Sequence, residues 1–232
     1  MNVFFHPASK DSINYLSPEE SHHCVKVLRL TQGQEIHIVD GAGTLYLAQI
    51  NHAHPRNCEF LTKKIIKKET RSFYIHIAIS PTKNFNRIEW FVEKAVELGV
   101  DEISFIQCER SERKILKTER LHKKAVSSLK QSGNLILPKI NNLRVFEDFV
   151  AGQNINSYSY ICHQSEDNPS LIDQLKRNQT YLVLIGPEGD FSPNELELAR
   201  AKGCTGVNLG RHTLRTETAG IAACHIFNLA NQ

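Results

Sequence analysis

Apolar and polar residues alternate in short segments over the first 70 residues, which is the pattern of half-buried β-strands. The segments that show it most clearly are 35–39, 45–50 and 57–66. Gly41 and Gly43 predict a hairpin turn between the first two. Ser17 with Pro18 predicts the start of a short helix that continues to about Leu28. Five or so short strands with one helix predict a small β-barrel.

A polar run at residues 67–71 changes this pattern and predicts a domain boundary. Beyond it, apolar segments of strand length alternate with segments whose apolar residues recur at three- and four-residue spacing. We expect strands at 73–80, 103–107, 157–163, 181–185 and 205–209, and helices at 87–98, 117–131, 193–202 and 217–230. Such alternation predicts an α/β domain with a mostly parallel sheet covered on both faces. The two expected domains are residues 1–70 and 71–232.

Local signals fix the ends of two of these helices. Gly99 follows the helix at 87–98 and is the residue type that favours the left-handed position after a helix. Ser192, Pro193 and Glu195 form the sequence of a capping box at the start of the next helix.

Two glycine-bearing loops near the C-terminus are candidate binding elements. One spans 186–191 and follows an apolar strand, and the other spans 209–218 and precedes the last helix. Ligands of open α/β sheets bind at the carboxyl ends of strands, where glycine lets them approach the backbone. We therefore expect the two loops to form one pocket. Neither loop matches a phosphate-binding fingerprint, which argues against a nucleotide hydrolase or a dehydrogenase.

The net charge of +3 conceals an uneven distribution. Eight Lys or Arg residues and only two acids lie between Arg110 and Lys130. Four of them recur at helical spacing and would share one side of the expected helix: Arg113, Lys117, Arg120 and Lys124. This side suits the phosphates of a nucleic acid, and a solvated helix face is the alternative.

Composition narrows the class of protein further. Hydrophobic residues make up 41% of the chain, which suffices for a packed core. None of the six cysteines stands in a Cys-x-x-Cys pair, so we expect no metal site and reduced, buried thiols in a cytoplasmic protein. No apolar run reaches the length of a membrane-spanning helix, and the first residues do not resemble a secretory signal.

Two C-terminal segments carry a family resemblance. Residues 185–199 (IGPEGDFSPNELELA) and 209–223 (LGRHTLRTETAGIAA) resemble the paired motifs of the RsmE family, the 16S rRNA uracil-N3 methyltransferases of the SPOUT superfamily. Further similar segments are 22–30 and 39–43, which resemble the family's PUA-like domain, and 93–100, 110–111 and 130–133 with Pro138. The chain departs from the family at Gly189-Asp190, where the family usually has two glycines.

The resemblance implies a C-terminal trefoil knot whose two loops bind S-adenosylmethionine. The expected cofactor-binding residues are Ile185, Gly186, Pro187, Glu188, Gly189, Leu209, Gly210, Leu214, Arg215 and Thr218, with His163 nearby at the end of its own strand. It also implies a homodimer that acts on small-subunit ribosomal RNA or on the assembled small subunit. The expected RNA contacts are Lys26, Arg29, Arg110, Arg113, Lys117, Arg120 and Lys124.

Methylation of uracil N3 requires loss of its proton, which spreads negative charge onto the uracil oxygens. A fixed cation would stabilise that charge, and Arg215 is the candidate. Glu217 is expected either to accept a proton or orient Arg215, or to act as a favourable charge at a helix N-terminus. Two alternatives stay open: a ribose 2′-hydroxyl as the methylated group, and a non-catalytic RNA-binding adaptor for ribosome assembly.

Overall fold

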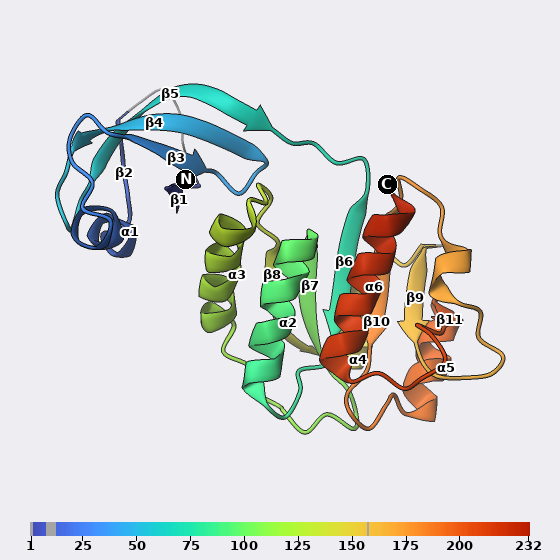
Figure 1. Cartoon of the computed structure of the whole chain (residues 1–232). Helices are drawn as coiled ribbons and strands as arrows, with labels where there is room; N and C mark the ends of the chain where they lie inside the picture. The colour runs from blue at the N-terminus through green and yellow to red at the C-terminus, as the bar shows by residue number, and fades with distance from the viewer. Residues whose placement is uncertain (1, 8–12, 157) are drawn as a thin grey trace. The chain divides into compact units, whose positions relative to one another are not determined.

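The computed structural model describes residues 2–7, 13–156 and 158–232, and the chain divides into two compact units (Figure 1). The first unit is Met1–Thr70 with Val126–Leu137, and the second is Arg71–Ala125 with Pro138–Gln232. The sequence-based division into 1–70 and 71–232 does not include this return of residues 126–137 to the first unit. The helix α3 (Thr118–Ser132) carries the chain from the second unit into the first.

The first unit contains a five-stranded sheet with one parallel and three antiparallel pairings. Its strands, in spatial order, are β1 (Val3–Phe5), β3 (Glu35–Val39), β4 (Thr44–His52), β5 (Glu59–Lys68) and β2 (Ile13–Tyr15). Phe4, Ile36, Ile38 and Phe60 are fully buried between the sheet and the helical segment that follows β2. That segment is α1 (Pro18–His22), continued by a π-helical turn, η1 (His23–Val27), where we expected one regular helix.

The tip of the β3–β4 hairpin binds the returning segment of the first unit. Gly43 donates its backbone N–H to the carbonyl of Leu135 at 3.0 Å, and Leu137 donates to the carbonyl of Gly41 at 2.9 Å. Both glycines have positive φ, +75° at Gly41 and +97° at Gly43. A Cβ at Gly43 would lie 2.5 Å from the carbonyl oxygen of Glu69, so glycine is required there for space as well as for conformation.

The second unit is built on a six-stranded, fully parallel sheet. Its strands, in spatial order, are β11 (Thr205–Val207), β9 (Ser159–Cys162), β10 (Thr180–Ile185), β6 (Tyr74–Ile79), β7 (Glu102–Gln107) and β8 (Lys139–Val145). The central strands β6 and β10 are almost continuously apolar and buried, as expected for strands covered on both faces. The predicted parallel α/β sheet is confirmed, whereas the trefoil knot stays a prediction.

Helices cover both faces of this sheet. On one face α2 (Phe85–Leu98) packs against α6 (Thr216–Ala230) so closely that a Cβ at Gly220 would lie 2.5 Å from the ring of Phe91. On the other face lie α4 (Phe146–Gly152) and α5 (Pro193–Ala201), whose residues Phe149 and Ala199 share a core with Leu184 of β10. Figure 1 shows α2 and α6 side by side in front of the sheet.

The helix-end signals read from the sequence are present in the structure. Gly99 ends α2 in the left-handed conformation, with φ of +84°. Ser192 accepts a hydrogen bond from the backbone of Glu195, whose side chain accepts one from the backbone of Ser192. All six cysteines are free, and none of the helices in the described parts of the chain has the length and apolar character to cross a membrane.

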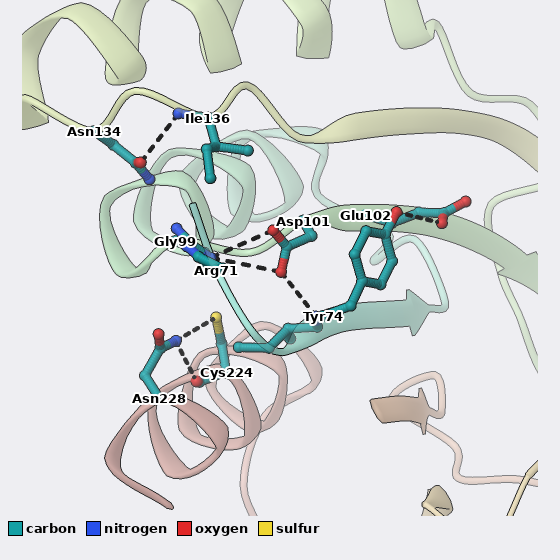
Figure 2. Close-up of polar contacts among 10 residues, drawn as sticks. Arg71, Tyr74, Gly99, Asp101, Glu102, Asn134, Ile136, Cys224 and Asn228 are labelled. Carbon is teal, nitrogen blue, oxygen red and sulfur yellow. Dashed lines mark hydrogen bonds and ion pairs between the residues drawn. The ribbon is translucent and has the colours of Figure 1, made fainter. Parts of the chain in front are cut away.

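A polar network joins the amino ends of the strands β6, β7 and β8. Asp101 accepts from the backbone N–H of Ile75 at 2.8 Å. It also pairs with Arg71, as Figure 2 shows. Glu102 accepts from the Tyr74 hydroxyl at 2.9 Å and from Lys139 at 3.0 Å (Figure 2 shows the first contact). These strands therefore begin at polar groups that bind one another.

Candidate active site

Three loops meet at the carboxyl ends of the adjacent strands β10, β9 and β11. The pairing register aligns Ile185, Cys162 and Val207 at these ends, so the loops that follow them emerge side by side. They enclose a cavity of about 370 Å³, which lies within the usual range of small-molecule sites. The sequence prediction that the loops after β10 and β11 form one pocket is confirmed.

Hydrogen bonds hold the three loops together. Thr216, the first residue of α6, donates its hydroxyl to the carbonyl of Gly186 at 3.0 Å and so joins the loops after β11 and β10. Asn208 donates its side-chain amide to the carbonyls of Ser165 at 2.7 Å and Asn168 at 2.9 Å, which joins the loops after β11 and β9. These hydrogen bonds fix the three loops relative to one another around the cavity.

Most of the predicted cofactor-binding residues line this cavity. They are His163, Ile185, Gly186, Pro187, Glu188, Leu209, Leu214 and Arg215. Three other predicted residues do not line it. Gly189 presents its carbonyl to Arg110 at 2.9 Å, Gly210 borders a neighbouring hollow, and Thr218 is exposed on α6.

Arg215 and Glu217 occupy different environments, although both belong to the same motif. Arg215 is the residue before α6, is exposed, and its guanidinium has no hydrogen bond or ion pair to any described residue. Glu217 is only 6% exposed and lies outside the cavity lining, with Oε1 at 3.6 Å from Arg87 Nε on α2. The structure therefore brings Arg215 to the cavity and directs Glu217 to the contact between α6 and α2.

Two acidic side chains of the loop after β10 have partners from other loops. Glu188 accepts a hydrogen bond from the backbone N–H of Lys83, which follows β6, at 3.2 Å. Asp190 Oδ2 lies 2.9 Å from His163 Nδ1, at the end of β9. The cavity is thus lined by cationic, anionic and apolar groups at once.

The predicted RNA-contact residues divide into paired and unpaired groups. Arg120 binds both carboxylate oxygens of Glu89 at 2.5 and 2.6 Å, and Lys124 binds Glu93 at 3.0 Å. Arg113 donates to the carbonyls of Thr82 and Lys83, and Arg110 to that of Gly189. By contrast, three predicted residues are exposed and have no ion pair within the described ranges: Lys26, Arg29 and Lys117.

Comparison with known proteins assigns the chain to a family. A family model described as an RNA methyltransferase domain matches residues 68–228, and one described as an RNA methyltransferase PUA domain matches residues 16–62. Ribosomal RNA small subunit methyltransferase E 2 of Borreliella burgdorferi is 33% identical over 212 residues, 89% of this chain and 86% of that protein. The chain belongs to the ribosomal RNA small subunit methyltransferase E family.

Other members and solved structures agree with this assignment. Ribosomal RNA small subunit methyltransferase E of Rickettsia conorii is 28% identical and covers 93% of this chain and 89% of its own length. A probable rRNA methyltransferase of Porphyromonas gingivalis superposes with a TM-score of 0.90 at 34% identity, covering 100% of this chain and 98% of its own. A methyltransferase structure from Legionella pneumophila, determined with bound cofactor SAM, gives a TM-score of 0.88 at 25% identity, covering 99% and 97%.

Several residues that line the cavity of this methyltransferase E family member were not predicted from the sequence. They are Cys162, Gln164, Asp190, Val207, Asn208, His212, Thr213, Thr216 and Ala219. The loop at 209–218, which the sequence predicted as a binding element, contains three of them: His212, Thr213 and Thr216. The sequence could therefore have predicted these three as lining residues. Cys162 and Val207 end their strands at the same level as Ile185, and that alignment depends on a register that the sequence does not show.

Proposed function

We propose that this chain transfers a methyl group from S-adenosylmethionine to N3 of a uridine in small-subunit ribosomal RNA. The observation that carries the proposal is the single cavity that the two family motifs form at the carboxyl ends of β10 and β11. The names of the curated relatives support the substrate class, and the SAM-bound Legionella pneumophila structure supports the cofactor. We place the reaction in the cytoplasm, with ribosomal RNA.

The lining of the cavity suits this cofactor. Ile185, Leu209 and Leu214 offer apolar contact, while backbone groups of the loops offer hydrogen bonds. A Cβ at Gly186 would lie 3.1 Å from the ring of Phe191, so a larger residue would disturb the loop that shapes the cavity. When bound, S-adenosylmethionine supplies a methyl group on a positively charged sulfur, ready for in-line displacement. The residues of the chain then have to align the base with it and keep the loops in place.

Arg215 is the residue that we propose for the chemical step. Its guanidinium faces the cavity without a partner among the described residues, so it is free to approach the uracil oxygens. Release of the N3 proton to solvent leaves negative charge on those oxygens, and a cation held beside them lowers the energy of that state. We propose that Glu217 supports the start of α6 through Arg87 rather than touching the base.

RNA binding and assembly complete the proposal. The unpaired cations Lys117, Lys26 and Arg29 contact phosphates, while Arg110 and Arg113 hold the loops beside the cavity. We propose a homodimer, because Trp90 on α2 is 45% exposed and Leu229 on α6 is 44% exposed although these two helices pack together. Sedimentation equilibrium of the full chain measures this state, and a monomer over the whole concentration range would contradict it.

Two measurements test the proposed function. Calorimetric titration of the full chain with S-adenosylmethionine should show binding at one site per chain. Nucleoside mass spectrometry of small-subunit ribosomal RNA should then show loss of 3-methyluridine when the gene is deleted and its return on complementation. Loss of a 2′-O-methylated nucleoside instead would reassign the methylated atom. Absence of cofactor binding would favour the RNA-binding adaptor.

A further inference from the structure

Asp190 adopts a backbone conformation that favours glycine. Its φ is +60°, and residues with side chains rarely enter this left-handed region, although Asp and Asn tolerate it best. The loop is tightly closed at this point, because the backbone N–H of Asp190 donates to the carbonyl of Pro187 at 3.0 Å. The motif that the loop resembles usually has glycine here. Unlike glycine, aspartate places a carboxylate at this turn, and that carboxylate can contact groups of other loops.

The Asp190 side chain bridges two of the loops that form the cavity. Oδ1 accepts from the backbone N–H of Phe191 at 2.8 Å, which fixes the carboxylate. Oδ2 lies 2.9 Å from Nδ1 of His163, and both residues line the cavity. The backbone of His163 is also held, because its N–H donates to Val207 at 3.3 Å and its carbonyl accepts from Asn168 at 2.6 Å. The backbone that carries the imidazole is therefore held in place, and so is the carboxylate that contacts its Nδ1.

The second ring nitrogen of His163, Nε2, is the atom of this pair that remains available to a ligand. Nε2 has no hydrogen-bond partner among the described residues, and the side chain is 23% exposed. A carboxylate that accepts from Nδ1–H fixes the proton on that nitrogen, so Nε2 of the neutral ring keeps a lone pair. Because His163 lines the cavity, this lone pair is an acceptor that the pair could offer to a ligand there.

We propose that Asp190 is a positioning residue that orients His163, and that His163 Nε2 accepts a hydrogen bond from an amino or hydroxyl group of the methyl donor. This inference rests on the proposed function, because it takes S-adenosylmethionine as the ligand of the cavity. It adds a contact that depends on two residues from two different loops.

Calorimetry with S-adenosylmethionine and the full chain tests the pair. Asp190→Gly suits the backbone but removes the acceptor for Nδ1–H, so Kd should rise roughly five- to tenfold, the value of about one hydrogen bond. Asp190→Asn tolerates the left-handed conformation and keeps a side-chain oxygen, so Kd should stay within about twofold of wild type. His163→Ala should raise Kd by at least as much as Asp190→Gly.

A double-mutant cycle decides whether Asp190 acts through His163. In the His163→Ala background, adding Asp190→Gly should change Kd by less than about twofold, because the residue that Asp190 orients is gone. With RNA substrate, Asp190→Gly should raise KM for the methyl donor and leave kcat within about twofold, since a bound donor is still aligned by the other contacts. Thermal unfolding without ligand shows whether each variant retains the fold.

The outcomes separate this inference from the proposed function. Wild-type chain that fails to bind S-adenosylmethionine would overturn the proposed function. Wild-type binding with an unchanged Kd in Asp190→Gly, or with fully additive effects in the double variant, would overturn only the positioning role of Asp190. Unchanged binding in His163→Ala would mean that the pair only links the two loops and does not contact the methyl donor.

Discussion

The amino ends of β6, β7 and β8 and the carboxyl ends of β10, β9 and β11 both carry polar side chains, but these side chains have different partners. At the amino ends, Glu102 accepts hydrogen bonds from Tyr74, Lys139 and Asn141. At the carboxyl ends, Arg215 has no such partner in the described structure, although it lines the cavity. The groups at the amino ends are satisfied within the fold, whereas Arg215 at the carboxyl ends is open to a ligand.

The difference follows from the cost of desolvation. Glu102 is only partly accessible to solvent, and its pKa is held below the usual value because His76, Asn141, Lys139 and Tyr74 together outweigh its burial. An unpaired charge in that place would cost several kcal/mol, so its partners are required for stability. Arg215 is exposed and keeps its hydration until substrate arrives. The comparison indicates that Arg215, which lines the cavity without an internal partner, is available to a substrate in a way that Glu102 is not.

The largest expected effect is that of Arg215→Ala on methyl transfer. Removing the cation that faces the uracil oxygens should lower kcat about a hundredfold or more, the usual loss for one such stabilising group. S-adenosylmethionine affinity should change far less, because the loops remain joined through Thr216 and Gly186. Single-turnover methylation of RNA measures the first quantity, and calorimetry measures the second.

Arg211→Ala is the matched control for this variant. Arg211 lies in the same loop and is exposed, but it borders a neighbouring hollow rather than the cavity. Its loss should change turnover only a few-fold. Equal losses in the two variants would mean that the loop's overall charge matters and that Arg215 has no individual role.

The second largest expected effect concerns His76, which lies in the polar network at the amino ends of β6, β7 and β8. Burial lowers the pKa of His76 to about 4, whereas in an unfolded chain it is about 6.5. The unfolded state therefore binds a proton that the folded state does not over this interval, so stability is full above about pH 6.5 and falls as the pH falls toward 4. We expect His76 to contribute a loss of about 2 kcal/mol between about pH 7 and about pH 5.

Urea unfolding of His76→Gln checks this value. Glutamine cannot titrate, and its amide can reach Ser104, the residue that His76 Nε2 contacts at 2.7 Å. The free energy of unfolding should depend less on pH in the variant than in wild type over this interval. Glu102 acts at lower pH, since the stability that its lowered pKa provides is lost as the pH falls from the usual pKa of an unfolded glutamate, about 4.3, through its own lowered pKa. Parallel curves for the two proteins would contradict the role assigned to His76.

Local sequence signals predicted the elements that depend on near neighbours. The end of α2 at Gly99 and the capping box of Ser192 and Glu195 each need only a few adjacent residues, and both are present. The two motif loops were also found, because strand, loop and helix follow one another in each. Their meeting in one cavity then followed from the parallel arrangement of β10 and β11 in the same sheet.

Elements that depend on distant contacts were missed. The sheet's edge strand β8 contains Asn141, Asn142 and Arg144, so its polar sequence lacks the apolar run of a buried strand. The return of residues 126–137 to the first unit depends on the hairpin tip at Gly41 and Gly43, far away in the sequence. Likewise, the bond between His163 and Asp190 joins two loops whose separate sequences give no sign of it.

Helical spacing predicted a continuous basic face, but the partners of these cations decide their roles. Lys117 and Lys124 belong to the same basic run, yet Lys124 pairs with Glu93 at 3.0 Å whereas Lys117 is exposed and unpaired among the residues described. The contrast between charges that have internal partners and charges that do not is therefore found within one basic segment as well as between the two ends of the sheet.

The smallest expected effect comes from comparing Lys117→Ala with Lys124→Ala. Loss of Lys117 should weaken RNA binding about two- to fourfold and reduce the salt dependence of the affinity by about one phosphate contact, with unfolding unchanged. Loss of Lys124 should lower stability by at most about 1 kcal/mol, because the ion pair is partly exposed, and should leave RNA affinity unchanged. Fluorescence anisotropy across a salt series measures binding, and urea unfolding measures stability. Equal effects of both variants on RNA affinity would show that pairing with Glu93 does not withdraw Lys124 from the RNA, and the distinction between the two charges would fail.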